Sequence, residues 1–466
     1  MMPVKLRIAQ SHHAAIQRHL FPHDGCEAVV VALCGRRRSH DRHVLTVQEI
    51  VPIPYDECKV RTPERVTWST ERIVPLLKRA AQRDLAILKI HSHPTGYPKF
   101  SSTDDASDKD VFSSIFGWTD SEYPHASAVM LPDGSMFGRA CMPDGSFEPL
   151  SSIMVPGDDI HFWTPDAAFV VPEFAKRNAQ LFGEATTQLL SRLTVVVVGA
   201  SGTGSPTVEQ VARLGFGRVV SIDHDHVEHK NLNRIVNATK DDADKEHNKV
   251  EVMKRAVKAM GLGTVFEAIN GNLASPNAVK AVAEADIVIG CMDGVEGRHL
   301  LSRLCAYYVL PYFDIGVKLV SDGKGGISEA VGAVHYVKPD GSTLLDRGVY
   351  TMELVKAEGL KRTDPKTYGE QLKVGYVHGV AVDRPAVISI NMQMSSTAVN
   401  EVLARLHPYR LDSNADSAIV RISFVQAITY REPEGAKSEM FTAQIGKGDV
   451  KPLLNMPELS EKDEKS

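Results

Sequence analysis

The chain has 466 residues, of which 43% are hydrophobic and 24% charged, and its formal net charge is −5. This length predicts two domains, and the charge gives no bulk attraction to nucleic acid or to anionic membranes. No apolar run reaches the roughly 20 residues of a membrane helix, and the N-terminal sequence MMPVKLRIAQSHH lacks the apolar core of a signal peptide. The six cysteines form no C-x-x-C pair, so we expect a cytoplasmic protein without a disulfide framework.

The first third of the chain alternates apolar, β-branched runs with stretches of helical period. A start signal at Ser69 or Thr70 accompanies the first helical stretch. The basic run Arg36-Arg37-Arg38 lies between two expected strands, and we interpret it as a solvated turn. We expect an α/β domain over residues 1–155. Its expected elements are strands at 25–35, 43–53 and 85–93, helices at 63–84 and 105–118, and a hairpin at 125–142.

After an expected linker at 156–172, the pattern changes to strand, glycine turn and helix. Continuous apolar strands of this kind are typical of a parallel sheet buried on both faces. Residues 320–385 are rich in glycine and irregular, which indicates an insertion or crossover. We expect a Rossmann-like domain with a mainly parallel sheet over 173–445 and a disordered, charged tail at 446–466. The clearest elements are strands at 194–200, 218–223 and 285–293 and a late helix at 386–406.

The stretch HSHPTGYPKFSSTD, residues 91–104, contains a candidate metal site. Side chains alternate along a strand, so His91 and His93 point to the same face. Asp104 follows a tight turn near the start of the next helix and can bend back as a third ligand. Three protein ligands with an open fourth position are typical of catalytic zinc, which lowers the pKa of a bound water to about 7. The alternative is a polar turn with two hydrogen-bonded histidines.

Two further side chains complete the expected chemistry. Glu27 lies in the apolar run GCEAVVVAL, where a carboxylate is costly without a role or partner, so it is a candidate proton shuttle. Ser101 could donate a hydrogen bond to a developing oxyanion. The spacing H-x-H, seven residues, S-x-x-D, with Glu27 upstream, resembles the JAMM motif of MPN-type metalloproteases. Over residues 1–150, this resemblance implies a JAB/MPN zinc peptidase or isopeptidase acting at the C-terminal tail of a ubiquitin-like protein.

A second motif, VVVVGASGTGS, is a strand, a glycine turn and a helix start. Gly199, Gly202 and Gly204 permit a tight backbone close to phosphate, and the helix N-terminus adds N–H donors. Asp223 ends the next strand, where it can accept from ribose hydroxyls. A dehydrogenase would show the same pattern to this point.

The following residues favour a triphosphate over a hydride carrier. DHDHVEHKNLNR brings Asn231 and Arg234 toward the phosphates, and EHNKVE supplies Lys249. Two cations directed at phosphates suit a triphosphate that is cleaved. Asp293 ends the strand in IVIGCMDG and is a candidate contact for magnesium or nucleotide.

Residues 170–430 resemble the ThiF-like adenylating enzymes, the superfamily of ubiquitin-activating enzymes. The resemblance implies that ATP and Mg²⁺ adenylate the C-terminal glycine of a ubiquitin-like or sulfur-carrier protein, with Arg234 and Lys249 stabilising the phosphates. Arg177 matches the family arginine that reaches the nucleotide site, often across a dimer, so a homodimer through this domain is expected. The matching segments are GASGTGS, IDHDHVEHKNLNR, NKVE, CMDGVEGR and ISINMQMSSTAVNEVL.

Two departures from the ThiF pattern concern its chemistry. Ser201 replaces a glycine of the loop, and no cysteine follows Cys305, so the acceptor cysteine and the paired zinc-binding cysteines are missing. We interpret Cys305 as a core thiol, and Cys291 is an alternative nucleophile near the nucleotide. The acyl adenylate would then pass to a partner's thiol, as in a conjugating enzyme, or to a sulfur donor.

The two motifs together predict a bifunctional enzyme whose halves act on the same substrate end. The peptidase would trim a precursor or cleave conjugates, and the second domain would adenylate the exposed glycine. One alternative is sulfur-carrier metabolism, in which the adenylate becomes a thiocarboxylate. The other is a non-catalytic scaffold that binds a ubiquitin-like partner.

Overall fold

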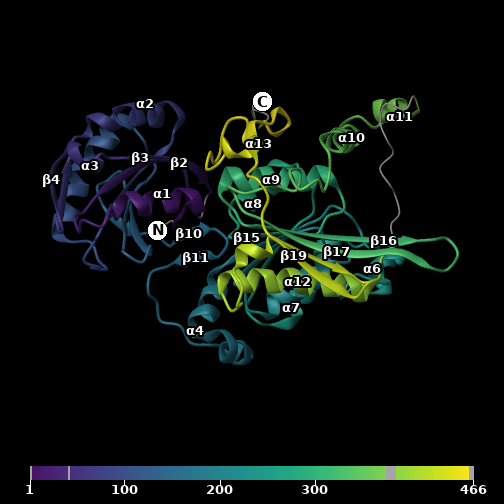
Figure 1. Cartoon of the computed structure of the whole chain (residues 1–466). Coiled ribbons are helices and arrows are strands. Elements are labelled where there is room, and N and C mark those ends of the chain that lie inside the picture. The colour runs from purple at the N-terminus through teal and green to yellow at the C-terminus, as the bar shows by residue number, and fades with distance from the viewer. Residues whose placement is uncertain (1–2, 40–41, 374–384, 461–466) are drawn as a thin grey trace. The chain divides into compact units, whose positions relative to one another are not determined.

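The computed structural model describes residues 3–39, 42–373 and 385–460, which form two compact units (Figure 1). Unit 1 contains Met1–Ala168, Ala306–Val309 and Met440–Asn455; unit 2 contains Phe169–Cys305, Leu310–Glu439 and Met456–Ser466. Within the described ranges, no helix is both long enough and apolar enough to cross a membrane.

A nine-stranded mixed sheet forms the centre of unit 1, in the order β11-β10-β1-β3-β2-β6-β7-β8-β9. Central β6 pairs antiparallel with β2 and parallel with β7. The strands are β1 (Val4–Arg7), β2 (Val29–Arg38), β3 (His43–Pro52), β6 (Ala86–Ser92), β7 (His125–Met130), β8 (Met136–Cys141), β9 (Phe147–Pro149), β10 (Ser152–Pro156) and β11 (Ile160–Trp163).

Both faces of this sheet are buried, because apolar residues alternate in direction along its central strands. In β2, Val30 and Ala32 join one core, whereas Val29 and Val31 join the other. Helix α1 (Gln10–Leu20) contributes to the first core. Helices α2 (Val74–Arg83) and α3 (Ser102–Thr119) contribute to the second. Lys89 and His91 alternate with Leu88 and Ile90, so they face the side that α2 and α3 cover.

The predicted strands, the hairpin at 125–142 and the helix at 105–118 are confirmed in unit 1. The helix predicted over 63–84 was too long: its first part forms the strand β5 (Arg65–Trp68), which pairs with β4 (Cys58–Thr62) in a hairpin. Ser69 then caps the turn Thr70–Ile73 ahead of α2, as its start signal predicted. Strand β10 lies where the first domain was expected to end, and strand β11 lies within the expected linker.

The interpretation of Arg36-Arg37-Arg38 as a solvated turn is wrong. All three residues lie on β2, and Arg36 and Arg37 are buried. Arg36 donates hydrogen bonds to the carbonyls of Asp84 and Pro124, which satisfies its guanidinium without solvent. Arg37 pairs with Asp449 at 3.2 Å.

Residues 440–455 therefore belong to unit 1 although they lie near the end of the chain. Gly35 donates its N–H to Gly446, and the Thr46 hydroxyl donates to the same carbonyl at 2.9 Å. Of the tail expected to be disordered, residues 446–460 are described and include the turns Leu453–Asn455 and Pro457–Leu459, whereas 461–466 lie outside the described residues. Domain boundaries remain a prediction.

Unit 2 has an eight-stranded sheet in the order β14-β13-β12-β15-β16-β17-β18-β19. The strands from β14 to β16 are parallel, which confirms the predicted Rossmann-like core, and those from β16 to β19 are antiparallel. The strands are β12 (Thr194–Val198), β13 (Arg218–Ile222), β14 (Val265–Ile269), β15 (Ile287–Gly290), β16 (Tyr312–Ser321), β17 (Ile327–Val337), β18 (Ile419–Ser423) and β19 (Ile428–Glu432).

Helices α7 and α12 lie on one side of this sheet, and α8 and α9 lie on the other (Figure 1). The predicted late helix is confirmed as α12, which packs against α5, β16 and β17. The helices of unit 2 are α4 (Lys176–Arg192), α5 (Gly204–Arg213), α6 (Lys240–Asp244), α7 (Lys249–Met260), α8 (Pro276–Ala283), α9 (Val295–Tyr308, which ends in unit 1), α10 (Met352–Thr363), α11 (Pro365–Lys373), α12 (Ile388–Leu406) and α13 (Glu439–Thr442, at the unit boundary).

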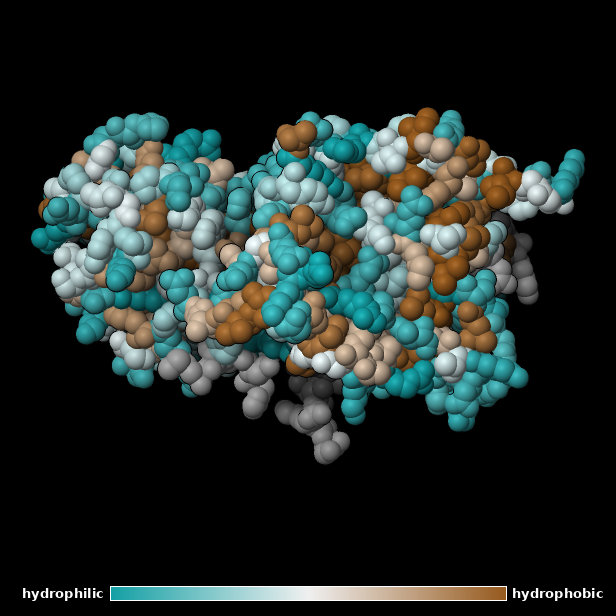
Figure 2. Space-filling view, turned by 90° about the horizontal axis from the view of Figure 1, so that it is seen from below, coloured by the Kyte–Doolittle hydropathy of each residue, from teal (hydrophilic) through white to brown (hydrophobic). Residues whose placement is uncertain are grey.

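Residues 320–385 are more regular than the glycine-rich sequence predicted. They contribute to the β16–β17 hairpin, which projects beyond the body of unit 2, and they form α10 and α11 (Figure 1). Residues 374–384 of this predicted insertion lie outside the described part of the chain. The face in Figure 2 is mostly hydrophilic, with separate hydrophobic patches that are common on folded proteins.

Candidate metal centre and nucleotide pocket

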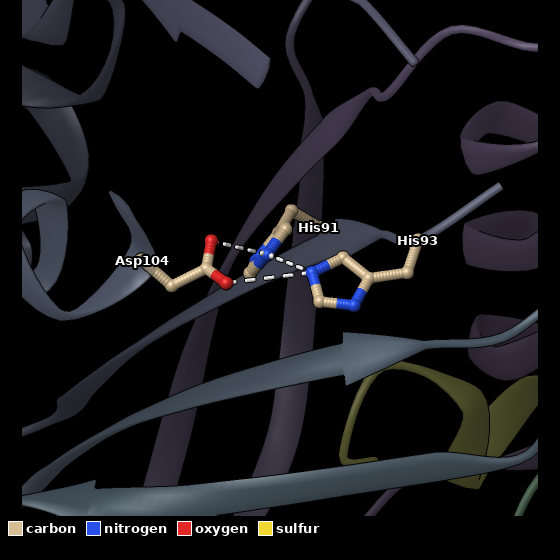
Figure 3. Close-up of side chains that lie close together, drawn as sticks. All are labelled: His91, His93 and Asp104. Atoms are coloured by element: carbon tan, nitrogen blue, oxygen red, sulfur yellow. Dashed lines mark hydrogen bonds and ion pairs between the residues drawn. The ribbon is translucent and has the colours of Figure 1, made fainter. Parts of the chain in front are cut away.

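The candidate metal centre lies where β6 ends and α3 begins. His91 is on β6, His93 follows that strand directly, and Asp104 is in the first turn of α3. Figure 3 shows the three side chains converging. Their relative exposures are 1%, 5% and 8%, so the cluster is buried. The juxtaposition expected from the H-x-H spacing and from a returning Asp104 is therefore present.

The ligand atoms of these three residues lie within 4.8 Å of one another. His91 Nε2 is 3.0 Å from Asp104 Oδ1, and His93 Nε2 is 3.5 Å from Asp104 Oδ2. The two Nε2 atoms are only 3.2 Å apart. When both imidazoles carry their proton on Nδ1, both Nε2 lone pairs are available to a cation between them. The set of two imidazoles and one carboxylate fits zinc.

Hydrogen bonds around the cluster orient its ligands. His93 Nδ1 is 2.7 Å from the carbonyl of Tyr97, which suits an Nδ1–H donor and leaves the Nε2 lone pair for a metal. Ser101 is the N-cap of α3, and its hydroxyl donates to Asp104 Oδ2 at 2.8 Å. Burial alone would raise the pKa of Asp104, but its close contacts with both histidines hold it well below its usual range.

Glu27 lies two residues before β2, not on the strand itself as expected. Its backbone N–H donates to the carbonyl of Thr62 at 2.8 Å, and its side chain is buried, with 6% exposure. Burial raises the pKa of Glu27 to about 7, and the electrostatic interaction with His93 opposes that rise. A carboxyl with a pKa near neutrality can both accept and release a proton, as the predicted shuttle requires.

A buried ion-pair network below the metal cluster was not recognised in the sequence. Lys89, two residues before His91, pairs with Asp108 at 2.6 Å, and Arg139 binds the other Asp108 oxygen at 2.7 Å. Asp108 is one helical turn after Asp104, so the network holds α3 against β6. The signal was a lysine in an apolar strand, LAILKIHSH, which needs a buried partner.

The candidate nucleotide pocket lies at the carboxyl ends of β12, β13 and β15, the edge where ligands bind in open α/β sheets. Gly199 has a φ of 95°, and a Cβ there would lie 2.7 Å from the carbonyl oxygen of Cys291. A side chain at Gly202 would collide with Asn391 of α12, and one at Gly204 with the Gly199 carbonyl. Gly199 and Gly204 are therefore required for close backbone packing, whereas Gly202 makes room for the Asn391 side chain.

The pocket has a volume of about 440 Å³. Its lining includes glycine-loop residues and both predicted cations, so the structure brings most of the predicted site together. Gly202 and Gly204 belong to the glycine loop but do not line the pocket. Arg177 is exposed on α4 and does not line the pocket either. The predicted residues in its wall are Gly199, Asp223, Asn231, Arg234, Lys249 and Asp293.

Lys249 begins α7 with its side chain largely buried. Its ammonium group pairs with Asp225 at 2.7 Å, a carboxylate that the sequence analysis had not assigned. The Asp223 carboxylate accepts hydrogen bonds from the backbone N–H groups of Ala200 and Asp225, at 2.7 and 2.9 Å. The Asn231 side chain caps the turn His229–Asn231 by accepting a hydrogen bond from the backbone N–H of Glu228. Asp223 and Asn231 are thus held by backbone N–H groups, and Lys249 by a carboxylate, before any ligand binds.

The cysteines of unit 2 are poor nucleophiles. Cys291 lines the pocket, but burial raises its pKa to about 12. Cys305 donates to the carbonyl of Leu310 at 2.7 Å, and burial raises its pKa well above the usual range. Its interpretation as a core thiol agrees with these contacts. A second cavity of about 580 Å³ shares Asp293 with the nucleotide pocket and is lined by Arg298, Arg347 and Arg421.

Two known protein families match the chain, one over each of its two main parts. The ThiF family matches residues 175–432, more than half of the chain, and the family of prokaryotic homologs of the JAB domain matches residues 9–132. The two resemblances that the sequence motifs indicated are confirmed.

Individual relatives match short parts of the chain. "SAMP-activating enzyme E1" of Haloferax volcanii is 32% identical over 117 residues, 25% of this chain and 43% of the relative. "Ubiquitin-like modifier-activating enzyme 5" of Drosophila willistoni is 29% identical over 27% of this chain and 33% of its own. "Adenylyltransferase and sulfurtransferase MOCS3" of Caenorhabditis briggsae is 29% identical over 28% of this chain and 32% of its own. The chain thus spans less than half the length of these relatives.

Among solved structures, Escherichia coli MccB with the peptide MccA-N7isoASN has a TM-score of 0.46 and 18% identity, covering 59% of this chain and 75% of that chain.

Proposed function

The chain belongs to the ThiF family, and from this premise we propose that it is a bifunctional enzyme acting on one protein terminus. Unit 2 adenylates the C-terminal glycine of a ubiquitin-like protein with ATP and Mg²⁺. Unit 1 is a zinc peptidase or isopeptidase that cleaves at the same terminus. The main support is the nucleotide pocket, which gathers a glycine loop, Lys249, Arg234 and Asp293 around one cavity.

In the adenylation step, a terminal carboxylate oxygen of the substrate attacks the α-phosphorus of ATP. The bond to the β-phosphate breaks, and pyrophosphate leaves. Lys249 and Arg234 stabilise the charge on the transferring phosphates, and Asp223 accepts from the ribose hydroxyls. Asp293 would hold Mg²⁺, which neutralises phosphate charge when bound. The arginine-lined cavity next to Asp293 offers a path for the substrate's terminal carboxylate.

In the cleavage step, His91, His93 and Asp104 would hold zinc. A zinc ion there would lower the pKa of water and polarise the scissile carbonyl. Glu27 accepts the proton of the attacking water and returns it to the leaving nitrogen, which its pKa of about 7 allows. Ser101 orients Asp104 in the described state. To donate to an oxyanion, its hydroxyl must first leave Asp104.

A second outcome of adenylation is supported by the buried thiols. Cys291 and Cys305 are both buried, and no cysteine follows them in the chain. The acyl group would therefore pass to a thiol of a partner, such as a conjugating enzyme, or to sulfide, which yields a thiocarboxylate. Exposed Arg177 could reach the nucleotide of a second copy in a homodimer. We place these reactions in the cytoplasm, where free thiols persist.

The adenylation proposal is tested with the chain itself as bait. The Glu27→Gln, Lys249→Ala double variant should retain a small ubiquitin-like protein ending in glycine or in a short tail beyond it. With that protein, wild-type enzyme should catalyse ATP–pyrophosphate exchange. Added sulfide and intact mass measurement then separate thiocarboxylate formation from protein conjugation. Absence of exchange with every captured carrier would overturn the proposed activation and favour a binding scaffold.

The metal proposal has its own measurement. Purified wild-type chain should contain about one zinc per molecule, and His91→Ala should lose it while ATP–pyrophosphate exchange persists. His161→Ala, which changes an exposed histidine of the same unit, is the matched control. Equal zinc content in all three proteins would show that His91 does not bind the metal.

A further inference from the structure

Unit 1 contains a cavity close to the metal cluster, although none of the three candidate ligands lines it. It has a volume of about 420 Å³, within the range of pockets that bind small ligands. Its walls come from the loop after His93, from β8 and β9, and from the end of β11. Phe100 and Phe137 stand at the junction with the metal cluster: their ring centroids lie 6.5 Å from His91 and 6.2 Å from His93.

The interior of this cavity is apolar. Its inner wall combines half-buried aromatic rings with buried aliphatic side chains, namely Phe100, Met136, Phe137, Leu150, Ile153 and Trp163. Arg139 also lines the cavity, but its charge is already paired with Asp108 and Asp105. The faces of its guanidinium are covered by Phe100 at 3.8 Å and Phe147 at 4.0 Å. The charge of Arg139 is therefore already neutralised on the inner wall, whereas Lys99, which also lines the cavity, is exposed.

We propose that this cavity binds a large apolar side chain of the polypeptide released by unit 1, at the first residue after the cleaved bond. This inference rests on the proposed cleavage after a terminal glycine. Glycine has no side chain, so on the modifier side nothing adjacent to the bond can fill a cavity whose Phe100 and Phe137 rings lie beside the two histidines. The first side chain beside the bond belongs to the leaving polypeptide, and Phe100 and Phe137 direct it into the cavity.

The cavity contains its own optical reporter. The three tryptophans of the chain are Trp68, Trp118 and Trp163, and only Trp163 lines the cavity. A Trp68→Phe, Trp118→Phe, Glu27→Gln variant of the full chain, loaded with zinc, therefore reports binding without cleavage. The probes are acetyl-Ala-Gly-Gly-Xaa-Ala-amide peptides in which Xaa is Phe, Leu, Ser or Asp.

The Phe and Leu peptides should shift the Trp163 emission and bind at least about tenfold more tightly than the Ser and Asp peptides, as burial of a large apolar side chain predicts. Pro149→Phe, which narrows the mouth on β9, should abolish this preference. Pro143→Phe is the matched control, because Pro143 is exposed on the same β-hairpin but does not line the cavity. The wild-type chain should show the same order in kcat/KM.

Equal binding of all four peptides, or no change in Trp163 emission with any of them, overturns the assigned cavity. A preference that follows the residue before the glycines, when that position is varied instead, places the cavity on the modifier side and also contradicts the inference. Failure of the peptidase proposal looks different: the Phe peptide binds to the variant, but the zinc-loaded wild-type chain cleaves none of the peptides.

Discussion

At the residue scale, the nucleotide pocket is charged before its ligand arrives. Only 7% of the Lys249 side chain is exposed, whereas 55% of the side chain of its partner Asp225 is exposed. Burial alone would raise the pKa of Asp225, and Lys249 keeps it below its usual range. A phosphate that enters the pocket can replace Asp225 as the partner of the Lys249 ammonium group, because water can then solvate the Asp225 carboxylate.

Lys249→Met should lower ATP–pyrophosphate exchange by about a hundredfold or more, because it removes a preorganised cation from the transferring phosphates. The free energy of unfolding of unit 2 should change little, since Asp225 remains accessible to water. Lys254→Met, an exposed position on the same helix, is the control. The exchange assay with the captured carrier measures both. Similar exchange in the two variants would remove Lys249 from the proposed mechanism.

His43 should make unit 1 sensitive to acid. It is buried and accepts a hydrogen bond from Arg36 at 3.3 Å, so it is neutral in the folded state. Burial, with repulsion from Arg36, lowers the pKa of His43 to about 3 from an ordinary 6.5. Between these values the unfolded chain binds the additional proton, so stability falls as the pH falls, by up to about 1.4 kcal/mol per pH unit.

His43→Gln keeps an acceptor for Arg36 and removes this titration. The free energy of unfolding of unit 1 should therefore fall less steeply between pH 6 and pH 4 in the variant. Urea unfolding followed by tryptophan fluorescence measures it, because all three tryptophans lie in unit 1. His161→Gln, at an exposed position, should keep the wild-type slope. An unchanged slope in His43→Gln would contradict the assignment.

At the element scale, α3 determines the geometry of the metal cluster. Its first turn carries Asp104 with its Ser101 cap, and its second turn carries Asp108, which pairs with Lys89 on β6 and Arg139 on β8. Asp108→Asn would leave buried Lys89 without a carboxylate and Arg139 with only the half-exposed Asp105. We expect a loss of about 3 kcal/mol or more in the stability of unit 1, together with weaker zinc retention.

Asp105→Asn is the informative control for this change. Asp105 also pairs with Arg139, but its side chain is 52% exposed, so its loss should cost less than about 1 kcal/mol. Tryptophan-monitored urea unfolding and zinc content are compared for the two variants. Equal losses would mean that burial of Asp108 does not govern the position of α3.

Local patterns predicted much of both units. Runs such as TVVVVGA and LAILKIHSH are long enough and bounded clearly enough to identify buried strands, and the H-x-H spacing placed two imidazoles on one face. The β4–β5 hairpin was missed because Val66 and Trp68 also fit the helical period that continues into α2. Strands β10 and β11 were missed because they are short and flanked by proline and glycine.

Contacts between distant residues were beyond the sequence. Arg36 and Arg37 looked like a solvated turn because their partners, the Pro124 carbonyl and Asp449, are 88 and 412 residues away. The same limit hid the Lys89, Asp108 and Arg139 network and the pairing of Lys249 with Asp225. In each case, the partner that stabilises the charge lies on another element and cannot be identified from local sequence.

At the scale of the whole molecule, the account joins two chemistries through one substrate terminus. Unit 1 is built from an N-terminal segment and residues 440–455, so the chain returns to it after completing most of unit 2. Both units therefore depend on the complete chain, and assays should use it undivided. The proposed peptidase and the proposed adenylating enzyme would then be present in equal amounts.

The most direct test is ATP–pyrophosphate exchange with the captured modifier, prepared with and without residues after its glycine. Wild-type chain should support exchange with both forms, whereas Glu27→Gln should support exchange only with the form that ends in glycine. Lys249→Met should fail with both, yet still shorten the longer form, as intact mass would show. If Glu27→Gln activates both forms equally, or if the wild-type chain activates neither, the two sites do not serve one terminus.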